Sequence, residues 1–262
     1  MKSQPLLRVE SLSHRFDGAR DGRFAVRGAS LQLFPGEVVA IVGESGSGKS
    51  TLLNAIAGRI TPTGGAVHYR AADGRWLDVH RMPERERRVL ARTEWGFVEQ
   101  NAGDGLRMDV SAGANIGERL MGQGLRHYGR LRDAASGWMQ RVELDALRID
   151  ESPRAYSGGM RQRLQIARNL VTRPRLVLMD EPTSGLDVSV QARLLDLIRL
   201  LVARLHLSAL IVTHDLGVAR LLAQRTLVMR EGSIVEQGLT DRVLDDPQHA
   251  YTQLLVSSVV AP

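Results

Sequence analysis

Residues Gly43 to Thr51 have the types and spacing to hold a phosphate group. They read Gly-Glu-Ser-Gly-Ser-Gly-Lys-Ser-Thr, after the apolar run 38–42 and before apolar residues at helical spacing. In such a strand, loop and helix, glycines let backbone N–H groups turn onto phosphate oxygens, and the helix directs its positive end at the same anion. Lys49 is then expected to reach the β- and γ-phosphates, and the Ser50 hydroxyl to ligate magnesium. The alternative is a glycine-rich turn that only connects a strand to a helix.

Lysine usage supports the phosphate-loop interpretation. The sequence has 35 lysine and arginine residues in total, and lysine stands only at positions 2 and 49. A compact ammonium on a flexible stem enters a phosphate cradle in a way that a planar guanidinium does not. A chain that otherwise uses arginine therefore keeps a lysine where the phosphate loop needs one.

Two carboxylates follow a second apolar run. Residues 176–179 are apolar, and Asp180 and Glu181 come directly after them. A buried strand that delivers an acid at its carboxyl end is how a phosphate-loop enzyme places the aspartate that holds magnesium. Asp180 is therefore the predicted metal ligand. Glu181, one residue further, is predicted to orient or deprotonate a water in line with the γ-phosphate.

Four further residues are candidates for the nucleotide site, and three of them also have a purely structural interpretation. His214 follows an apolar run, on the edge where parallel sheets bind ligands. Gln100 either faces the magnesium or the attacking water, or merely ends a strand. Phe16 either stacks on adenine or packs in the core. Ser157 and the two glycines after it start a helix, whose N-terminus is either a second phosphate site or an ordinary N-cap.

The hydrophobic pattern predicts the elements that carry these residues. Strands are expected over 6–16, 29–33, 38–42, 66–70, 95–100, 176–180 and 209–213, with a hairpin over 229–237. The first two of these strands are expected to be edge strands. Helices are expected after the phosphate loop and over 83–92, 157–170, 188–205 and the C-terminal segment. Between residues 101 and 153, apolar residues at helical spacing alternate with glycines, which predicts a helical insert in an α/β core.

Composition narrows the class of protein. The 262 residues suffice for one large α/β domain or a core with a subdomain. No run reaches the ~18 uncharged apolar residues of a membrane span, and the first seven residues lack a signal-peptide pattern. The absence of cysteine excludes disulfides and thiolate metal sites, so a cytoplasmic location is expected. The net charge of +6 favours an anionic partner. A nucleic-acid groove is disfavoured, because glutamates interrupt the arginine-rich run 81–92 and aromatic residues make up only 4% of the chain.

With these motifs in order, the sequence resembles the nucleotide-binding domains of ATP-binding cassette (ABC) proteins over residues 6 to 255. The resemblance implies an α/β fold of the P-loop NTPase class, with a RecA-like core, an antiparallel β subdomain and an α-helical subdomain. It implies a single domain over residues 6–258, with the helical subdomain inserted at about 101–170. It also implies an ATPase that converts ATP and water to ADP and phosphate, with ATP and Mg²⁺ as cofactors.

The resemblance assigns a role to each motif. Gln100 is similar to the Q-loop glutamine, Ser157 begins the signature, Ser184 to Asp187 match the D-loop, and His214 matches the switch histidine. The implied catalytic residues are Lys49, Gln100, Glu181 and His214, and the implied metal ligands are Ser50, Gln100 and Asp180. The implied ATP-binding residues are Phe16, Gly43, Glu44, Ser45, Gly46, Ser47, Gly48, Lys49, Ser50, Thr51, Ser157, Gly158 and Gly159.

Two positions depart from the usual family pattern. Phe16 stands where tyrosine is common, and Met160 replaces the usual glutamine after Ser-Gly-Gly. Phe16 retains a ring that can stack, whereas Met160 lacks the amide. The family also implies a homodimer that closes head to tail over two Mg-ATP, so that Lys49 and Ser50 of one chain face Ser157 of the other.

Within the family, several segments resemble the cassette proteins of the bacterial carbon-phosphorus lyase system for phosphonate breakdown. The segments are 92–96, 104–107, 115–121, 126–129, 211–220 and 251–258. This implies the lyase core subunits as partners and a second cassette protein as a further candidate, with no nucleic acid and no direct membrane span. The alternative is an ATPase subunit of a peptide- or nickel-type ABC importer, which shares the stretch 157–163 and a related tail. A third interpretation, a DNA-binding or scaffold cassette, lacks a visible second cassette, coiled-coil arms or zinc element.

Overall fold

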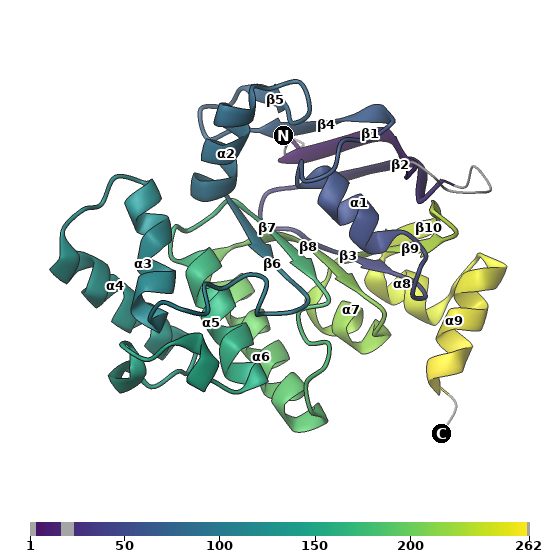
Figure 1. The fold of residues 1–262 in the computed structure, drawn as a ribbon. Helices are drawn as coiled ribbons and strands as arrows, with labels where there is room; N and C mark the ends of the chain where they lie inside the picture. The colour runs from purple at the N-terminus through teal and green to yellow at the C-terminus, as the bar shows by residue number, and fades with distance from the viewer. Residues whose placement is uncertain (1–3, 17–23, 261–262) are drawn as a thin grey trace. The chain divides into compact units, whose positions relative to one another are not determined.

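The computed structural model describes residues 4–16 and 24–260. The chain divides into two compact units, which we call unit 1 (residues 1–87 and 206–262) and unit 2 (residues 88–205). Figure 1 labels the helices and strands and colours them by position along the chain. The predicted extent of the cassette domain, 6–258 with a helical part at about 101–170, stays a prediction.

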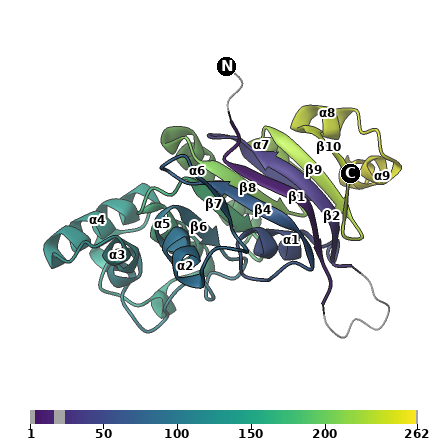
Figure 2. The ribbon, with the colours of Figure 1, turned by 90° about the horizontal axis from the view of Figure 1, so that it is seen from above.

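Unit 1 contains an antiparallel sheet in the strand order β2-β1-β4-β5. Its strands are β1 (Leu7–His14), β2 (Val26–Leu33), β4 (Gly64–Arg70) and β5 (Trp76–Asp78). β1 pairs with β2 on one side and with β4 on the other, as Figure 2 shows. The prediction that residues 6–16 form an edge strand is therefore wrong. Alternation of buried and exposed residues reports one buried face but does not report how many neighbours a strand has.

Unit 1 also contains the strand that leads into the phosphate loop. β3 (Val38–Val42) lies between β8 (Ser208–Thr213) and β9 (Arg225–Arg230), parallel to both. Every residue of β3 and β8 is buried, as expected for parallel strands covered on both faces. The predicted hairpin is confirmed: β10 (Ser233–Leu239) runs antiparallel to β9, and the turn residues Glu231 and Gly232 have φ of 47° and 82°.

Unit 1 also contains helices, which lie between and after its strands in the chain. They are α1 (Lys49–Ile56), α7 (Leu216–Leu222), α8 (Thr240–Asp245) and α9 (Ala250–Val260). α1 begins at the end of the phosphate loop, as predicted, and buries Leu52, Leu53 and Ile56. α2 (Glu84–Thr93) begins after Pro83, as predicted, and leads from unit 1 into unit 2.

Unit 2 contains a parallel pair of strands and the predicted helices. β6 (Trp95–Val98) pairs with β7 (Leu176–Asp180), and the helices are α3 (Ala112–Gly122), α4 (Tyr128–Arg141), α5 (Gly158–Leu170) and α6 (Val188–Leu205). Short 3₁₀ turns lie at Ala146–Arg148 and Pro153–Ala155. β6 ends two residues before the predicted strand 95–100 does. Within residues 4–16 and 24–260, no helix has the length and apolar character to cross a bilayer.

Candidate functional site

The loop between β3 and α1 has a backbone that requires glycine. Gly43 and Gly48 have φ of 149° and 101°. A Cβ atom on Gly43 would lie 2.2 Å from the Met229 carbonyl oxygen, and one on Gly48 would lie 2.1 Å from the Ala25 carbonyl oxygen. Both distances are far below van der Waals contact, so no other residue fits there. The loop therefore packs directly against the backbone at the end of β9 and before β2.

Lys49, the first residue of α1, folds its side chain back over this loop. Its ammonium donates to the carbonyl oxygens of Gly43 and Glu44, each at 2.8 Å, and the residue is only 5% exposed. The first turn of α1 contains no acidic residue, so no side chain there offsets the positive end of the helix dipole. A phosphate oxygen placed in the loop would meet both this ammonium and the helix end.

Ser47 provides an independent test of whether a phosphate group fits. Its hydroxyl is buried and has no hydrogen-bond partner, although buried polar groups normally have one. The backbone of Ser47 is bound, because its N–H donates to the Glu44 carbonyl at 3.2 Å and its carbonyl accepts from the Gly232 N–H at 3.0 Å. An unpartnered donor inside a glycine loop is consistent with an oxygen-rich ligand, so the residues present fit a phosphate group.

A contact from the C-terminal helix also holds the loop. The Glu44 N–H donates to the Tyr251 hydroxyl of α9 at 3.1 Å, and Tyr251 is 4% exposed. The Arg230 guanidinium lies over the Tyr251 ring, 5.1 Å from its centre. Tyr251 is not among the site residues predicted from the sequence. The signal that could have found it is a tyrosine within the apolar C-terminal segment, because a buried tyrosine hydroxyl usually has a hydrogen-bond partner.

The sheet of unit 1 brings His214 to the same edge as the phosphate loop. Val42 of β3 pairs with Thr213 of β8, so Gly43 and His214 are the next residues on two neighbouring parallel strands. His214 is exposed there, directly before α7. A loop that holds phosphate and an accessible imidazole therefore share one carboxyl edge, the ligand-binding edge of such sheets.

Two more features of unit 1 bear on a nucleotide. Phe16 follows β1 with 52% of its surface exposed, and its ring meets the His14 ring edge-on at 4.6 Å. The alternative of core packing for Phe16 is therefore wrong, because about half of its surface is exposed. A cavity of about 440 Å³ opens beside Gly46, and its wall includes Arg27, Arg230 and His249, together with Glu231.

Unit 2 brings together the predicted acids and Gln100. Val98 of β6 pairs with Met179 of β7, so Gln100 and Asp180 both lie near the carboxyl ends of these strands. The Gln100 amide donates to the Ser184 hydroxyl at 3.3 Å. Asp180 is 7% exposed, and Glu181 has a φ of 45°, a left-handed conformation that costs a non-glycine residue about 1 kcal/mol. Such strain is kept where the surrounding structure requires it.

The start of α5 carries the signature residues. The Ser157 hydroxyl accepts from the Met160 N–H at 3.3 Å, so Ser157 is an N-cap. Ser157 and Gly158 are exposed, whereas a Cβ on Gly159 would lie 2.5 Å from Val190. The Met160 sulfur accepts from the Arg148 guanidinium at 3.6 Å, a weak contact in place of a glutamine amide.

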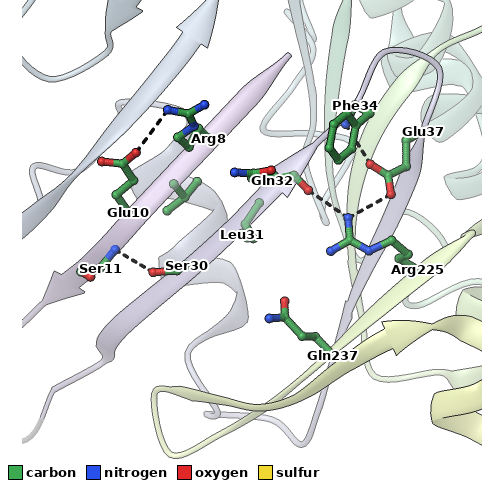
Figure 3. A pocket seen from close by; sticks show the side chains of 11 residues that line it. Arg8, Glu10, Ser11, Ser30, Leu31, Gln32, Phe34, Glu37, Arg225 and Gln237 are labelled. Carbon is green, nitrogen blue, oxygen red and sulfur yellow. Dashed lines mark hydrogen bonds and ion pairs between the residues drawn. The ribbon is translucent and has the colours of Figure 1, made fainter. Parts of the chain in front are cut away.

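A cavity of about 870 Å³ in unit 1 has none of the predicted site residues in its wall. Figure 3 shows its charged groups paired with one another: Arg225 donates to the Gln32 carbonyl at 3.2 Å and to the Glu37 carboxylate at 3.1 Å. Arg8 and Glu10 form an ion pair at 3.7 Å across the opposite side. The wall therefore offers no excess of positive charge for a triphosphate.

Known proteins resemble this chain in sequence. The chain is 60% identical over 258 residues, 98% of this chain and 99% of the relative, to the phosphonates utilization ATP-binding protein PhnK of Escherichia coli K12. It is 39% identical to the oligopeptide transport ATP-binding protein AmiE of Streptococcus pneumoniae, over 90% of this chain and 67% of that protein.

Solved structures also share the fold. The ATP-binding cassette MJ0796, as a dimer in a post-hydrolysis state bound to ADP and Pi, matches with a TM-score of 0.79 and 27% identity over 89% of this chain and 98% of that one. CbiO1 of Clostridium perfringens matches with a TM-score of 0.78 and 26% identity over 93% and 92% of the two chains. The sequence model of the ABC transporter family matches residues 26–184. The chain therefore belongs to the ABC transporter family, as one of its ATP-binding cassettes.

Proposed function

We propose that this protein binds and hydrolyses Mg-ATP and serves a phosphonate-utilisation system. The observation that carries ATP binding is the phosphate loop: glycines that no other residue can replace, a buried lysine over the loop, and a buried hydroxyl without a partner. The unpartnered hydroxyl is costly without a ligand, and the lysine and the helix end beside it favour an anionic one.

The roles of the side chains follow from the order of the motifs and from these positions. Lys49 and the N–H groups of the loop bind the phosphates, and Phe16 stacks on the adenine ring. Ser50, Asp180 and Gln100 would hold magnesium, which neutralises charge on the phosphate oxygens when bound. A hydroxyl, a carboxylate and an amide are oxygen donors of the kind that Mg²⁺ prefers.

Hydrolysis requires an activated water and stabilisation of the charge that spreads over the γ-phosphate. Glu181 polarises the water, and His214 contacts the γ-phosphate. Most of the rate enhancement comes from the positive groups that face the transferred phosphoryl, Lys49 among them. Glu181 directly follows β7 and has a left-handed backbone conformation.

The protein acts as a head-to-tail dimer in this proposal. Ser157 and Gly158 are exposed at the start of α5, where they are accessible to an ATP bound by a second chain. The dimeric MJ0796 structures provide the precedent within the fold. Each ATP would then lie between Lys49 and Ser50 of one chain and Ser157, Gly158 and Gly159 of the other.

The identity of the relatives favours phosphonate utilisation over peptide import. Identity to PhnK is 60% and covers 99% of that protein, against 39% and 67% for AmiE. We therefore propose subunits of the carbon-phosphorus lyase core as partners, and a permease of a peptide-type importer as the alternative.

Two measurements test the proposal. Mg-ATP binding and phosphate release by the purified chain are expected, and Lys49→Ala is expected to abolish both while leaving the fold intact. Affinity capture from cells grown on a phosphonate is expected to recover lyase core subunits. Recovery of membrane permeases instead would support the importer, and a chain with no affinity for Mg-ATP would refute the catalytic part.

A further inference from the structure

Side chains from two helices of unit 2 bind the outer edge of β6. β6 is the last strand of its sheet and pairs with β7 on its inner side. An edge strand presents N–H and C=O groups that must be paired or covered. Here the N–H groups of Phe97 and Glu99 donate to side-chain amides of α5, and the Trp95 carbonyl accepts from Arg119 of α3. Side chains therefore bind two alternate residues of β6, Trp95 and Phe97, and Glu99 directly after the strand.

Gln165 of α5 binds both backbone groups of Glu99. Its amide oxygen accepts from the Glu99 N–H, and its amide nitrogen donates to the Glu99 carbonyl at 3.3 Å. Gln162, one turn earlier, donates to the same carbonyl at 3.3 Å. Gln165 is fully buried, and a buried amide whose hydrogen bonds all lie within the protein is held in one orientation.

Asn169 acts in the same way two residues back along the strand. Its amide oxygen accepts from the Phe97 N–H at 3.0 Å, and its amide nitrogen donates to the Gln165 carbonyl at 2.9 Å. A Cβ on Gly96 would lie 3.3 Å from the Asn169 Cβ, and one on Gly105 would lie 2.6 Å from the Gln165 side chain. The backbone thus makes room for both amides, which we call the amide clamp (Gln165 and Asn169).

The amide clamp connects two motifs of the proposed ATPase. Glu99 directly precedes Gln100, whose amide reaches Ser184 at 3.3 Å. α5, which carries the clamp, begins at the Ser157 N-cap. We propose that Gln165, supported by Asn169, is a positioning residue that fixes Gln100 to the signature helix, so that the two move as one body. The inference rests on the proposed function, in which Gln100 faces the magnesium or water and Ser157 faces the ATP of a second chain.

Substitution of Gln165 by methionine tests this inference. Gln165→Met keeps the length of the side chain but removes its hydrogen bonds. We expect kcat for ATP to fall about tenfold while KM stays within about twofold, because a small displacement of a catalytic group affects the transition state more than ground-state binding. If Gln165 acts through Gln100, Gln165→Met lowers kcat no further in a Gln100→Ala background. A loss by the same factor in both backgrounds would overturn the proposal.

Amide hydrogen exchange provides a readout that needs no nucleotide. Exchange at the Glu99 N–H, which donates to the Gln165 amide oxygen, is expected to accelerate in Gln165→Met, and unchanged exchange there would also overturn the clamp. The matched control is Asn115→Leu, because Asn115 is another fully buried amide that binds the backbone of Arg107, Val110 and Ser111. Its amide oxygen also accepts from the Arg168 guanidinium of α5 at 3.3 Å, but none of these hydrogen bonds reaches β6 or Glu99. The control is expected to lower stability without changing kcat of the folded protein or exchange at Glu99.

Two further measurements distinguish failure of the inference from failure of a variant to fold and from failure of the proposed function. If Gln165→Met does not fold, Asn169→Ala removes the hydrogen bonds from the Phe97 N–H and to the Gln165 carbonyl while leaving the Gln165 side chain in place, and its kcat loss must likewise vanish in the Gln100→Ala background. If the wild-type chain hydrolyses no ATP, the proposed function fails, and the exchange measurement still decides whether the clamp holds the strand. If Asn115→Leu lowers kcat as much as Gln165→Met does, the loss reflects a general effect on stability, and the proposal is overturned.

Discussion

Lys49 occupies a buried site that suits an ammonium better than a guanidinium. Its ammonium is buried over the loop and holds two carbonyl oxygens at 2.8 Å. A point charge on a flexible stem can shift from these carbonyls to a phosphate oxygen, whereas a planar guanidinium needs a wider site. Arginine is the common basic residue of this chain, so the lysine at this position is informative.

Lys49→Arg tests that argument more sharply than removal of the charge. A planar guanidinium is larger than the buried ammonium that it replaces, so ATP affinity is expected to fall at least tenfold although the charge is kept. Titration with a fluorescent ATP analogue measures this, and the melting temperature shows whether the loop has been distorted. Affinity equal to the wild type would mean that charge alone suffices at this position.

Glu236 provides a prediction on pH. Burial opposes its ionisation, but the N–H groups of Gln248 and His249, at 2.8 and 3.0 Å, outweigh that and hold the pKa of the carboxyl below its usual value. A lowered pKa in the folded state adds stability above the unfolded pKa, and this is lost as the pH falls through the folded value. Glu236→Gln is expected to cost about 1 kcal/mol at pH 7, at the low end because the carboxyl is partly exposed.

Urea unfolding at pH 7 and at about pH 4 measures that difference. The stability gap between wild type and Glu236→Gln should shrink at the lower pH, where the wild-type carboxylate begins to protonate. Glu86→Gln on the exposed face of α2 is the control, with little change at either pH. A gap that grows on acidification would contradict the role of the carboxylate.

At the scale of elements, the phosphate loop depends on segments that are distant in the chain. Gly48 approaches the backbone before β2, Gly43 approaches the end of β9, and Glu44 is bound by α9. Each of these contacts restricts the backbone conformations that the loop can adopt before any ligand binds. Preorganised N–H groups bind an anion at less entropic cost, which links the packing of unit 1 to nucleotide affinity.

Gly48→Ala is expected to destabilise unit 1 by more than about 2 kcal/mol, because the new Cβ would lie 2.1 Å from the Ala25 oxygen at a φ of 101°. Gly137→Ala in α4 is the matched control: nothing lies within 4 Å of its Cβ position, and alanine there is expected to stabilise the helix by about 0.5–1 kcal/mol. Thermal and urea unfolding compare the two. Equal effects of the two substitutions would refute the close approach.

Tyr251→Phe isolates the contribution of the C-terminal helix. It removes the hydroxyl that accepts from the Glu44 N–H while keeping the buried ring. Loss of this bond is expected to cost about 1 kcal/mol of stability and to weaken ATP binding several-fold. Tyr128→Phe is the control, since Tyr128 is 72% exposed on α4. If ATP affinity is unchanged in Tyr251→Phe, α9 packs against the loop without positioning it.

At the scale of the whole molecule, each unit holds a part of the proposed site. Unit 1 holds the phosphate loop, Phe16 and His214, and unit 2 holds Gln100, the two acids and the signature helix. The exposed start of α5 leaves the signature accessible to a second chain. The proposed catalytic unit is therefore the dimer rather than the single chain.

Glu181→Gln tests the dimer and the chemistry together. The amide cannot activate water, so hydrolysis is expected to fall by about 10²–10⁴-fold while ATP stays bound. Size-exclusion chromatography with ATP is expected to show a dimer for Glu181→Gln. Glu86→Gln serves as the control for a glutamate on the surface. A variant that binds ATP yet remains a monomer would count against the head-to-tail arrangement.

The sequence by itself determined the local motifs. The phosphate loop, the acids at the end of β7 and the strands and helices that carry them are contiguous stretches, and their residue types follow from local backbone geometry and hydrophobic period. The predicted helix 188–205 and the hairpin around Glu231 and Gly232 are confirmed for that reason.

Only the tertiary structure decided which distant residues hold those motifs in place. β1 is an interior strand because β4 pairs with its second edge. Tyr251 binds Glu44 across 207 residues of sequence, Gln165 binds Glu99 across 66, and Asn169 binds Phe97 across 72. Periodicity reports which face of an element is buried, but not which side chain completes a backbone hydrogen bond there. That choice depends on how elements pack after the chain has folded.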